Sequence, residues 1–101
     1  RLQTLNVFGL PWPLSTDVEP RCRRIAAELA ASAPDVVALQ EAWGTEATSP
    51  FALDGYGRAI ADPSGGVLGT SGLMTLSRHA IRSAELRRFE AGGGVERLVA
   101  K

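Results

Sequence analysis

The chain has 101 residues, of which 45% are hydrophobic and 22% charged, a composition typical of a folded domain and not of a disordered segment. Eleven basic residues balance eleven acidic ones, so no overall field attracts nucleic acid or an anionic membrane, although a local basic groove is compatible with this balance. The single cysteine, Cys22, excludes an internal disulfide and a cysteine-rich zinc site, and no apolar run approaches the ~20 residues of a membrane span.

The first 40 residues predict a strand, a helix and a second strand. Residues 1–8 mix Leu, Val and Phe with Thr and Asn, which indicates a strand. A helix is expected from Asp17 or Val18 to about Ser32, with Asp17 as its N-cap. Residues 35–40 are almost wholly apolar, as expected of an interior strand covered on both faces. This order predicts a βαβ unit.

The predicted helix is amphipathic. Arg21 and Arg24, with Glu28, fall on one face and are interpreted as solvated. Apolar residues at helical spacing predict the buried face, which comprises Val18, Cys22, Ile25, Ala26, Leu29 and Ala30.

The remainder of the chain predicts further strands separated by glycine-rich connections. Together with the first 40 residues, this indicates an α/β fold with a mixed sheet. The expected elements are a loop over 43–55 with one helical turn near Phe51 and Leu53, strands over 56–61, 72–77 and 81–89, a connection over 62–72, a turn at Gly92–Gly94 and the start of a strand over 95–101.

Polar side chains stand where the first two strands end. Asn6 lies in the first strand, and Gln40 and Glu41 close the second. If the strands are neighbours, an amide and a carboxylate meet at the edge where ligands bind in open α/β sheets, and a hard divalent cation favours such oxygens. Each residue alone also fits a structural role: Glu41 as a solvated strand end, Asn6 as a tie between strands and Gln40 as a backbone cap.

Other candidates are weaker. His79 is the only histidine, but its surroundings indicate an exposed turn joining two strands. The stretch Gly65–Thr70 lacks the Lys-Ser/Thr ending of a phosphate-binding P-loop, so no nucleotide cradle is assigned there. Trp12 and Trp43 flank the two strand ends, where they either line a pocket or fill the core.

Several motifs in order resemble those of one known superfamily. They are the segment Leu5–Pro11, the helix residues around Arg24 and Leu29, the segment Pro34–Trp43 and the segment Ser71–Ile81. In this order and at this spacing, they resemble the amino-terminal part of the endonuclease/exonuclease/phosphatase superfamily, which has the fold of DNase I. The Leu-Asn-aromatic-Gly-Leu-Pro and Glu-Ala-Trp forms are most similar to its neutral sphingomyelinase-like branch.

The resemblance implies the N-terminal portion of a four-layer α/β/β/α sandwich. It matches Asn6 to the active-site asparagine of the superfamily and Glu41 to its magnesium-binding glutamate, with Mg²⁺, or alternatively Mn²⁺, as cofactor. The implied reaction is metal-dependent hydrolysis of a phosphoric ester, with a phospholipid head group such as that of sphingomyelin as substrate. A nuclease of the same superfamily and a non-catalytic binding module are the alternatives.

The later motifs of the superfamily, which hold the catalytic histidines, an Asp-x-Asn pair and a terminal Asp-His, have no counterpart here. His79 sits in the early Ser-Arg-His turn, where Ala80 replaces a common proline, and is not the general base. We therefore expect residues 1–101 to be the N-terminal part of a single domain, truncated at both ends and inactive alone. The compartment, the oligomeric state, the general base and the other metal ligands are left unassigned.

Overall fold

The computed structural model describes residues 1–10, 12–61, 71–89 and 97–100. Its elements are β1 (Leu2–Asn6), α1 (Val18–Ser32), β2 (Val36–Gln40), α2 (Gly44–Thr48), the 3₁₀ turn η1 (Ser49–Phe51), β3 (Gly57–Ile60), β4 (Met74–Ser77), β5 (Leu86–Phe89) and β6 (Arg97–Ala100). The predicted α/β class is confirmed. Neither described helix is long and apolar enough to cross a membrane.

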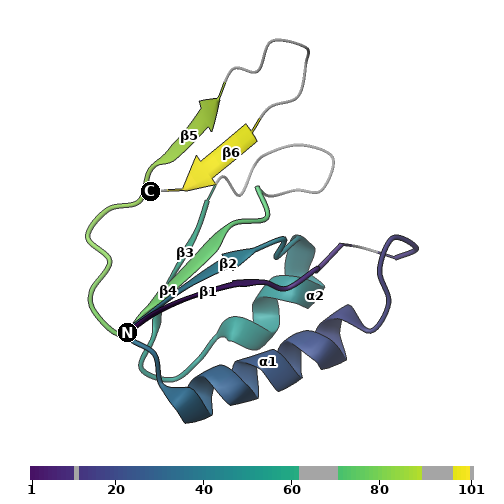
Figure 1. The fold of residues 1–101 in the computed structure, drawn as a ribbon, viewed down its shortest axis with the longest axis horizontal. Helices are drawn as coiled ribbons and strands as arrows, with labels where there is room; N and C mark the ends of the chain where they lie inside the picture. Colours follow the sequence, from purple (N-terminus) through teal and green to yellow (C-terminus); the bar gives the residue numbers. More distant parts are fainter. Residues whose placement is uncertain (11, 62–70, 90–96, 101) are drawn as a thin grey trace.

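Strands β1 to β4 form a mixed sheet with the order β1-β2-β4-β3 (Figure 1). β1 and β2 run parallel, with Leu2 opposite Val36 and Asn6 opposite Gln40. β4 is antiparallel to both of its neighbours. The predicted strand–helix–strand unit is therefore present, because α1 connects two parallel neighbours. β5 and β6 form a separate antiparallel pair.

Helix α1 occupies the predicted range, and four of the six predicted apolar positions are buried in it: Val18, Cys22, Ala26 and Leu29. The predicted position of the N-cap is confirmed, but the cap lacks a side-chain hydrogen bond. Asp17 stands at the cap position, but its φ of 54° is left-handed and its side chain makes no capping hydrogen bond. The Asp17 carbonyl accepts the Arg21 N–H at 3.0 Å, which is the ordinary first hydrogen bond of the helix.

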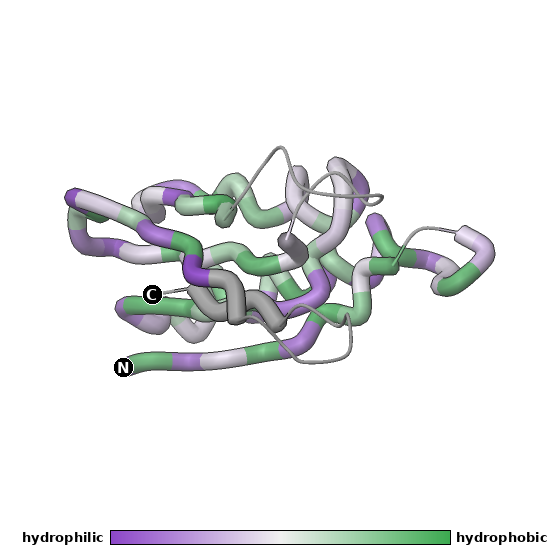
Figure 2. The backbone as a smooth tube through the Cα atoms, turned by 90° about the horizontal axis from the view of Figure 1, so that it is seen from above, coloured by the Kyte–Doolittle hydropathy of each residue, from purple (hydrophilic) through white to green (hydrophobic). Residues whose placement is uncertain are grey.

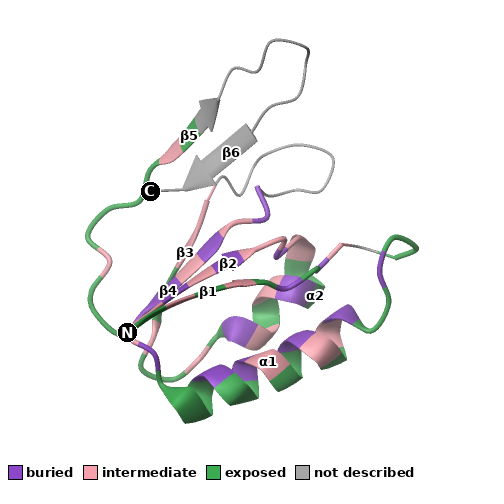
Figure 3. Cartoon of the chain, viewed as in Figure 1, coloured by how far each residue is buried: buried purple, intermediate pink, exposed green. Residues whose placement is uncertain are grey.

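The core lies between the sheet and its helical layer, and buried residues are coloured purple in Figure 3. Figure 2 shows the hydropathy of each residue along the backbone. One face of the sheet contributes Val37 and Leu39 from β2 and Leu76 from β4, all fully buried. Phe51 of η1 is also fully buried, which explains why the short segment between β2 and β3 folds into helical turns. About 1.5–3 kcal/mol per buried side chain of this size holds the layers together.

The opposite face of the sheet has a middle row of small side chains. Register places Thr4, Ala38, Thr75 and Ala59 in one row across β1, β2, β4 and β3. Thr4 is exposed and the other three are half-buried. The prediction that the second strand is covered on both faces is therefore not met within the described residues, where helices cover only one face.

The other predicted elements are partly confirmed. Strands occur within 56–61 and 72–77, and the expected helical turn near Phe51 is two consecutive turns, α2 and η1. The predicted strand over 81–89 is regular only from Leu86, so its first half was overpredicted. Within 95–101, β6 is present. The predictions for Gly65–Thr70 and for Gly92–Gly94 fall outside the described residues.

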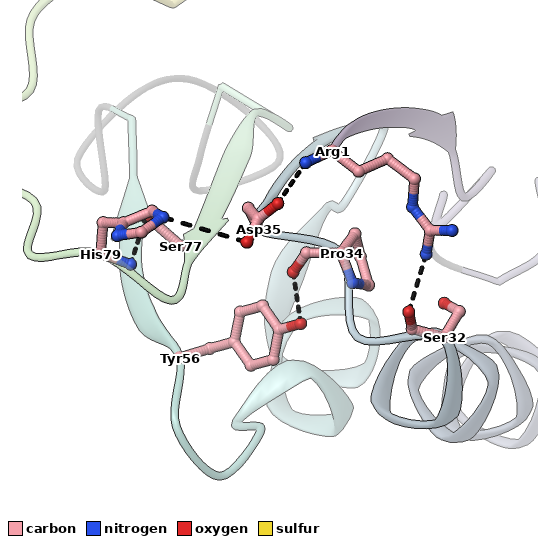
Figure 4. Close-up of polar contacts among 7 residues, drawn as sticks. All are labelled: Arg1, Ser32, Pro34, Asp35, Tyr56, Ser77 and His79. Atoms are coloured by element: carbon pink, nitrogen blue, oxygen red, sulfur yellow. Dashed lines mark hydrogen bonds and ion pairs between the residues drawn. The ribbon is translucent and has the colours of Figure 1, made fainter.

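Polar contacts hold the start of β2, and Figure 4 shows these contacts. The Arg1 guanidinium donates from Nη2 to the Ser32 carbonyl at 2.8 Å. The Tyr56 hydroxyl donates to the Pro34 carbonyl at 2.5 Å. His79 lies in the predicted turn, exposed, with Nε2 3.9 Å from Asp35 Oδ1. This cluster organises the strand starts and lies at the opposite end of β2 from the candidate site.

Candidate functional site

The ends of β1 and β2 lie side by side. Asn6 is paired with Gln40, and the Val7 N–H donates to the Gln40 carbonyl at 2.9 Å. Because the two strands are parallel and adjacent, Asn6 and Glu41 emerge at the same edge of the sheet. The prediction that the two apolar runs are neighbouring strands is confirmed.

The backbone around Glu41 is fixed from both sides. Its carbonyl accepts the Gly9 N–H at 2.7 Å, and the next N–H, of Ala42, donates to the Gly72 carbonyl at 2.9 Å. These bonds hold Glu41 at a φ of 56°, a left-handed conformation that costs a non-glycine residue about 1–2 kcal/mol. Three segments that are distant in the sequence, around Gly9, Glu41 and Gly72, thus fix the backbone that carries the carboxylate.

The Glu41 side chain contains a buried oxygen without a partner. Oε2 is shielded from solvent and, within the described part of the chain, has no hydrogen bond. A buried carboxylate oxygen without a partner costs several kcal/mol, whereas a cation would offset this cost. No group of three or more His, Cys, Asp or Glu gathers among the described residues, but Mg²⁺ usually takes only one or two protein carboxylates. The Glu41 carboxylate therefore fits one ligand position of a magnesium site.

The carboxamide oxygen of Asn6 accepts a hydrogen bond from within the chain. Its Oδ1 accepts the Phe8 N–H at 2.9 Å, a local turn, so it does not tie β1 to β2 as one of the alternatives predicted. This bond fixes which end of the amide is oxygen and leaves Nδ2 with two hydrogens to donate. Asn6 is exposed at the strand end.

Gln40 performs the structural role instead. Its Nε2 donates to Thr4 Oγ1 of β1 at 2.9 Å and to the Ala38 carbonyl at 3.2 Å. The first of these bonds ties the two parallel strands together next to the site. The alternative in which Gln40 satisfies backbone groups holds in part, through Ala38.

Two glycines permit close approach at the site. A Cβ on Gly9 would lie 2.6 Å from the Glu41 carbonyl oxygen and 2.5 Å from the Ala47 Cβ. A Cβ on Gly72, whose φ is +74°, would lie 2.8 Å from the Trp43 ring. Trp43 is therefore half-buried against backbone, and its Nε1 is shielded without a partner among the described residues.

Sequence reasoning missed a second left-handed residue at the site. Phe8 has a φ of 48°, two residues beyond the end of β1. Such residues cost about 1–3 kcal/mol each and cluster at functional sites. Neither Phe8 nor Glu41 is a residue type that favours this conformation, so no sequence signal marked it.

The prediction that Arg21 is solvated is wrong. Its Nη2 donates to the Phe8 carbonyl at 2.6 Å and to Ser15 Oγ at 3.3 Å, and its Nη1 donates to the Thr16 carbonyl at 2.9 Å. Ser15 Oγ also donates to the Phe8 carbonyl at 3.2 Å. Arg21 thus joins the two ends of the loop between β1 and α1. Its partners are mainly backbone carbonyls, which no helical periodicity identifies.

Trp12 does not fill the core, one of its two predicted alternatives, because its side chain is exposed. The outcome for Trp43 is different, since its ring packs on Gly72 beside Glu41.

The described part of the chain thus places an amide and a carboxylate at the ends of two adjacent parallel strands in a mixed sheet. Residues 4–101 match the model of the Endonuclease/Exonuclease/phosphatase family, and the chain belongs to that family. The mixed sheet and its helical layer are consistent with the N-terminal part of that fold.

The chain is also similar to a Drosophila melanogaster protein named "Putative neutral sphingomyelinase", with 32% identity over 105 residues. This match covers 94% of the chain and 22% of that relative. The resemblance to the superfamily and to its neutral sphingomyelinase-like branch is therefore confirmed. Enzymes of this family hydrolyse phosphoric esters and generally use divalent metal ions.

Proposed function

We propose that this chain supplies the amide and one metal ligand of a magnesium-dependent phosphodiesterase acting on a phospholipid head group such as that of sphingomyelin. The observation that carries the proposal is the buried, unpartnered Oε2 of Glu41 at the strand end beside Asn6. The family membership supports the reaction class, and the similarity to the Drosophila protein supports the substrate class.

Glu41 is the proposed ligand of the metal. The Gly9 N–H donates to the Glu41 carbonyl, and the Ala42 N–H donates to the Gly72 carbonyl. These bonds preorganise the Glu41 carboxylate, so little ordering accompanies binding of the metal. A bound Mg²⁺ supplies Lewis-acid polarisation of a phosphoryl oxygen. Mn²⁺, which also favours oxygen ligands, is the proposed substitute.

Asn6 is the proposed donor to the substrate. Since Oδ1 accepts the Phe8 N–H, Nδ2 is held in a fixed direction and can donate to a phosphoryl oxygen. A preorganised donor of this kind stabilises the charge that develops in the transition state. In this role Asn6 binds and orients the phosphate, and no proton transfer is assigned to it.

The charge balance bears on the substrate. Eleven basic and eleven acidic residues give no net attraction for a polyanion, which favours a single head group over a nucleic acid. A nuclease is accordingly the second proposal within the family, and a non-catalytic module is the alternative of a different class.

The test compares Glu41→Gln with Glu46→Gln in the natural full-length protein. Both changes remove one carboxylate, but Glu46 is exposed on α2. We expect Glu41→Gln to lower Mg²⁺-dependent hydrolysis of sphingomyelin by at least about 100-fold and Glu46→Gln to leave it nearly unchanged. Wild-type activity in Glu41→Gln would reject Glu41 as a metal ligand.

The same preparations are assayed with DNA as substrate. Cleavage of DNA but not of sphingomyelin would favour the nuclease. Saturable sphingomyelin binding without turnover of either substrate would favour the binding module.

A further inference from the structure

The loop between β1 and α1 carries large apolar side chains that face solvent. Trp12 is 79% exposed, Leu14 is 65% exposed and Phe8 is 52% exposed. In Figure 3 this loop extends beyond the end of the sheet, beside the N-terminus of α1, and is mostly exposed. Exposed apolar residues gathered on one short loop are more informative than the same residues scattered singly.

The loop is built to hold these side chains outward. Arg21 and Ser15 both donate to the Phe8 carbonyl, and Arg21 also reaches the Thr16 carbonyl, so the two ends of the loop are fastened together. Ser15 is buried, which anchors the loop directly behind Leu14. Phe8 keeps a strained left-handed backbone although its side chain finds no buried environment. Strain of this kind at an exposed apolar residue points to a role in binding.

The loop has no charge of its own, since none of residues 8–16 is acidic or basic. Its chemistry is that of Trp, Leu and Phe, which occupy the boundary between lipid chains and head groups. It also adjoins the candidate site, because Gly9 in the loop donates to the Glu41 carbonyl. A flat apolar surface that met this loop would therefore lie next to Asn6 and Glu41.

We propose that Phe8, Trp12 and Leu14 form a lipid-docking loop, which inserts into the head-group boundary of a zwitterionic phospholipid bilayer and presents head groups to the strand-end site. This inference rests on the proposed function, since it names the form in which the substrate reaches that site. The attraction is apolar, so docking does not depend on anionic lipid and persists at high salt.

The experiment measures co-sedimentation of the natural full-length protein with phosphatidylcholine vesicles in EDTA, where catalysis is absent. The test variant is Leu14→Ser, and the matched control is Leu2→Ser, because Leu2 is 72% exposed at the other end of β1. We expect Leu14→Ser to lower the partition coefficient about tenfold and Leu2→Ser to leave it nearly unchanged. Trp12→Ala is expected to lower it by at least as much as Leu14→Ser.

Three results would overturn the lipid-docking loop. The first is equal partitioning of Leu14→Ser and the parent protein. The second is loss of binding in high salt, which would indicate an electrostatic surface elsewhere. The third is a large fall in the melting temperature of Leu14→Ser but not of Leu2→Ser, which would show that another part of the protein covers the loop.

A second assay separates this inference from the proposed function. Hydrolysis of a dispersed short-chain substrate is compared with hydrolysis of the same head group in vesicles. We expect the ratio of vesicle to dispersed hydrolysis to fall in Leu14→Ser. Vesicle binding without hydrolysis of either substrate would reject the proposed function and retain the docking loop, whereas hydrolysis of the dispersed substrate without vesicle binding would do the reverse.

Discussion

Gly9 and Glu41 are joined by a backbone hydrogen bond of 2.7 Å, although 32 positions separate them in the numbering. The approach is so close that a Cβ on Gly9 would lie 2.6 Å from the Glu41 carbonyl oxygen. The loop after β1 therefore sets the position of the backbone that carries the candidate metal ligand.

Gly9→Ala is expected to destabilise the protein and to weaken metal binding together. The added methyl meets backbone at Glu41 and the Ala47 Cβ at 2.5 Å, so one of these segments must move, at a cost of about 1–3 kcal/mol. Urea unfolding and a Mg²⁺ titration measure the two effects. Gly57→Ala is the control, because its Cβ would meet nothing closer than 3.8 Å. If both variants behaved like the parent protein, the close approach would have no energetic consequence.

Gly72→Ala should be more destabilising than Gly55→Ala. Both glycines have left-handed φ values, +74° and +80°, so each substitution incurs about 1 kcal/mol of backbone strain. Only at Gly72 would the methyl also meet the Trp43 ring, at 2.8 Å, whereas nothing lies within 4 Å at Gly55. We expect an excess of about 1–3 kcal/mol for Gly72→Ala in urea unfolding. Equal losses would mean that the Trp43 ring moves aside without cost.

Arg21→Gln should loosen the loop without changing its apolar side chains. It removes charge-assisted hydrogen bonds to the Phe8 and Thr16 carbonyls, which are worth about 1.5–3 kcal/mol in favourable cases. Hydrogen exchange of the amides between residues 8 and 16 should become faster, and vesicle partitioning should fall. Arg24→Gln, at an exposed position on α1, is the control. Unchanged exchange in Arg21→Gln would show that Ser15 alone holds the loop.

Stability should decline at alkaline pH because of Cys22. Burial raises the pKa of this thiol, an effect that Arg21 opposes and Glu19 adds to. Below the pKa of the unfolded thiol, both states are protonated and pH has no effect through this group. Above it, the unfolded chain releases its proton first, so the free energy of unfolding falls as pH rises. The decline in the urea midpoint from about pH 8 to about pH 10 should be smaller in Cys22→Ala. Equal slopes would contradict the assignment.

The sequence predicted what depends on local pattern. The helical spacing of Val18, Cys22, Ala26 and Leu29 located α1, and two apolar runs ending in polar residues located the meeting of β1 and β2. Both follow from burying one face of each element. These signals are short-range, and they were sufficient to predict that the ends of the two strands lie side by side.

Long-range contacts account for what was missed. The left-handed backbone of Glu41 is imposed by partners at Gly9 and Gly72, not by any preference of glutamate. Helical periodicity places Arg21 outside the apolar stripe and therefore predicted a solvated side chain. Its guanidinium instead donates hydrogen bonds to the Phe8 and Thr16 carbonyls of the preceding loop. Asp17 stands at the predicted cap position, but with its left-handed backbone its side chain makes no capping hydrogen bond to the first turn.

The strain at Glu41 makes a last prediction with opposite signs for stability and function. Asparagine tolerates the left-handed region better than glutamate does, and its neutral side chain does not bury an unpartnered charge. In EDTA, Glu41→Asn should therefore melt at a higher temperature than the parent protein, by the equivalent of about 1 kcal/mol. In saturating MgCl₂ the order should reverse, because binding of the ion stabilises only the protein that retains the carboxylate. A variant that gains as much from MgCl₂ as the parent would show that the ion binds elsewhere. A variant that melts lower in EDTA would show that the surrounding hydrogen bonds, and not strain, dominate at this position.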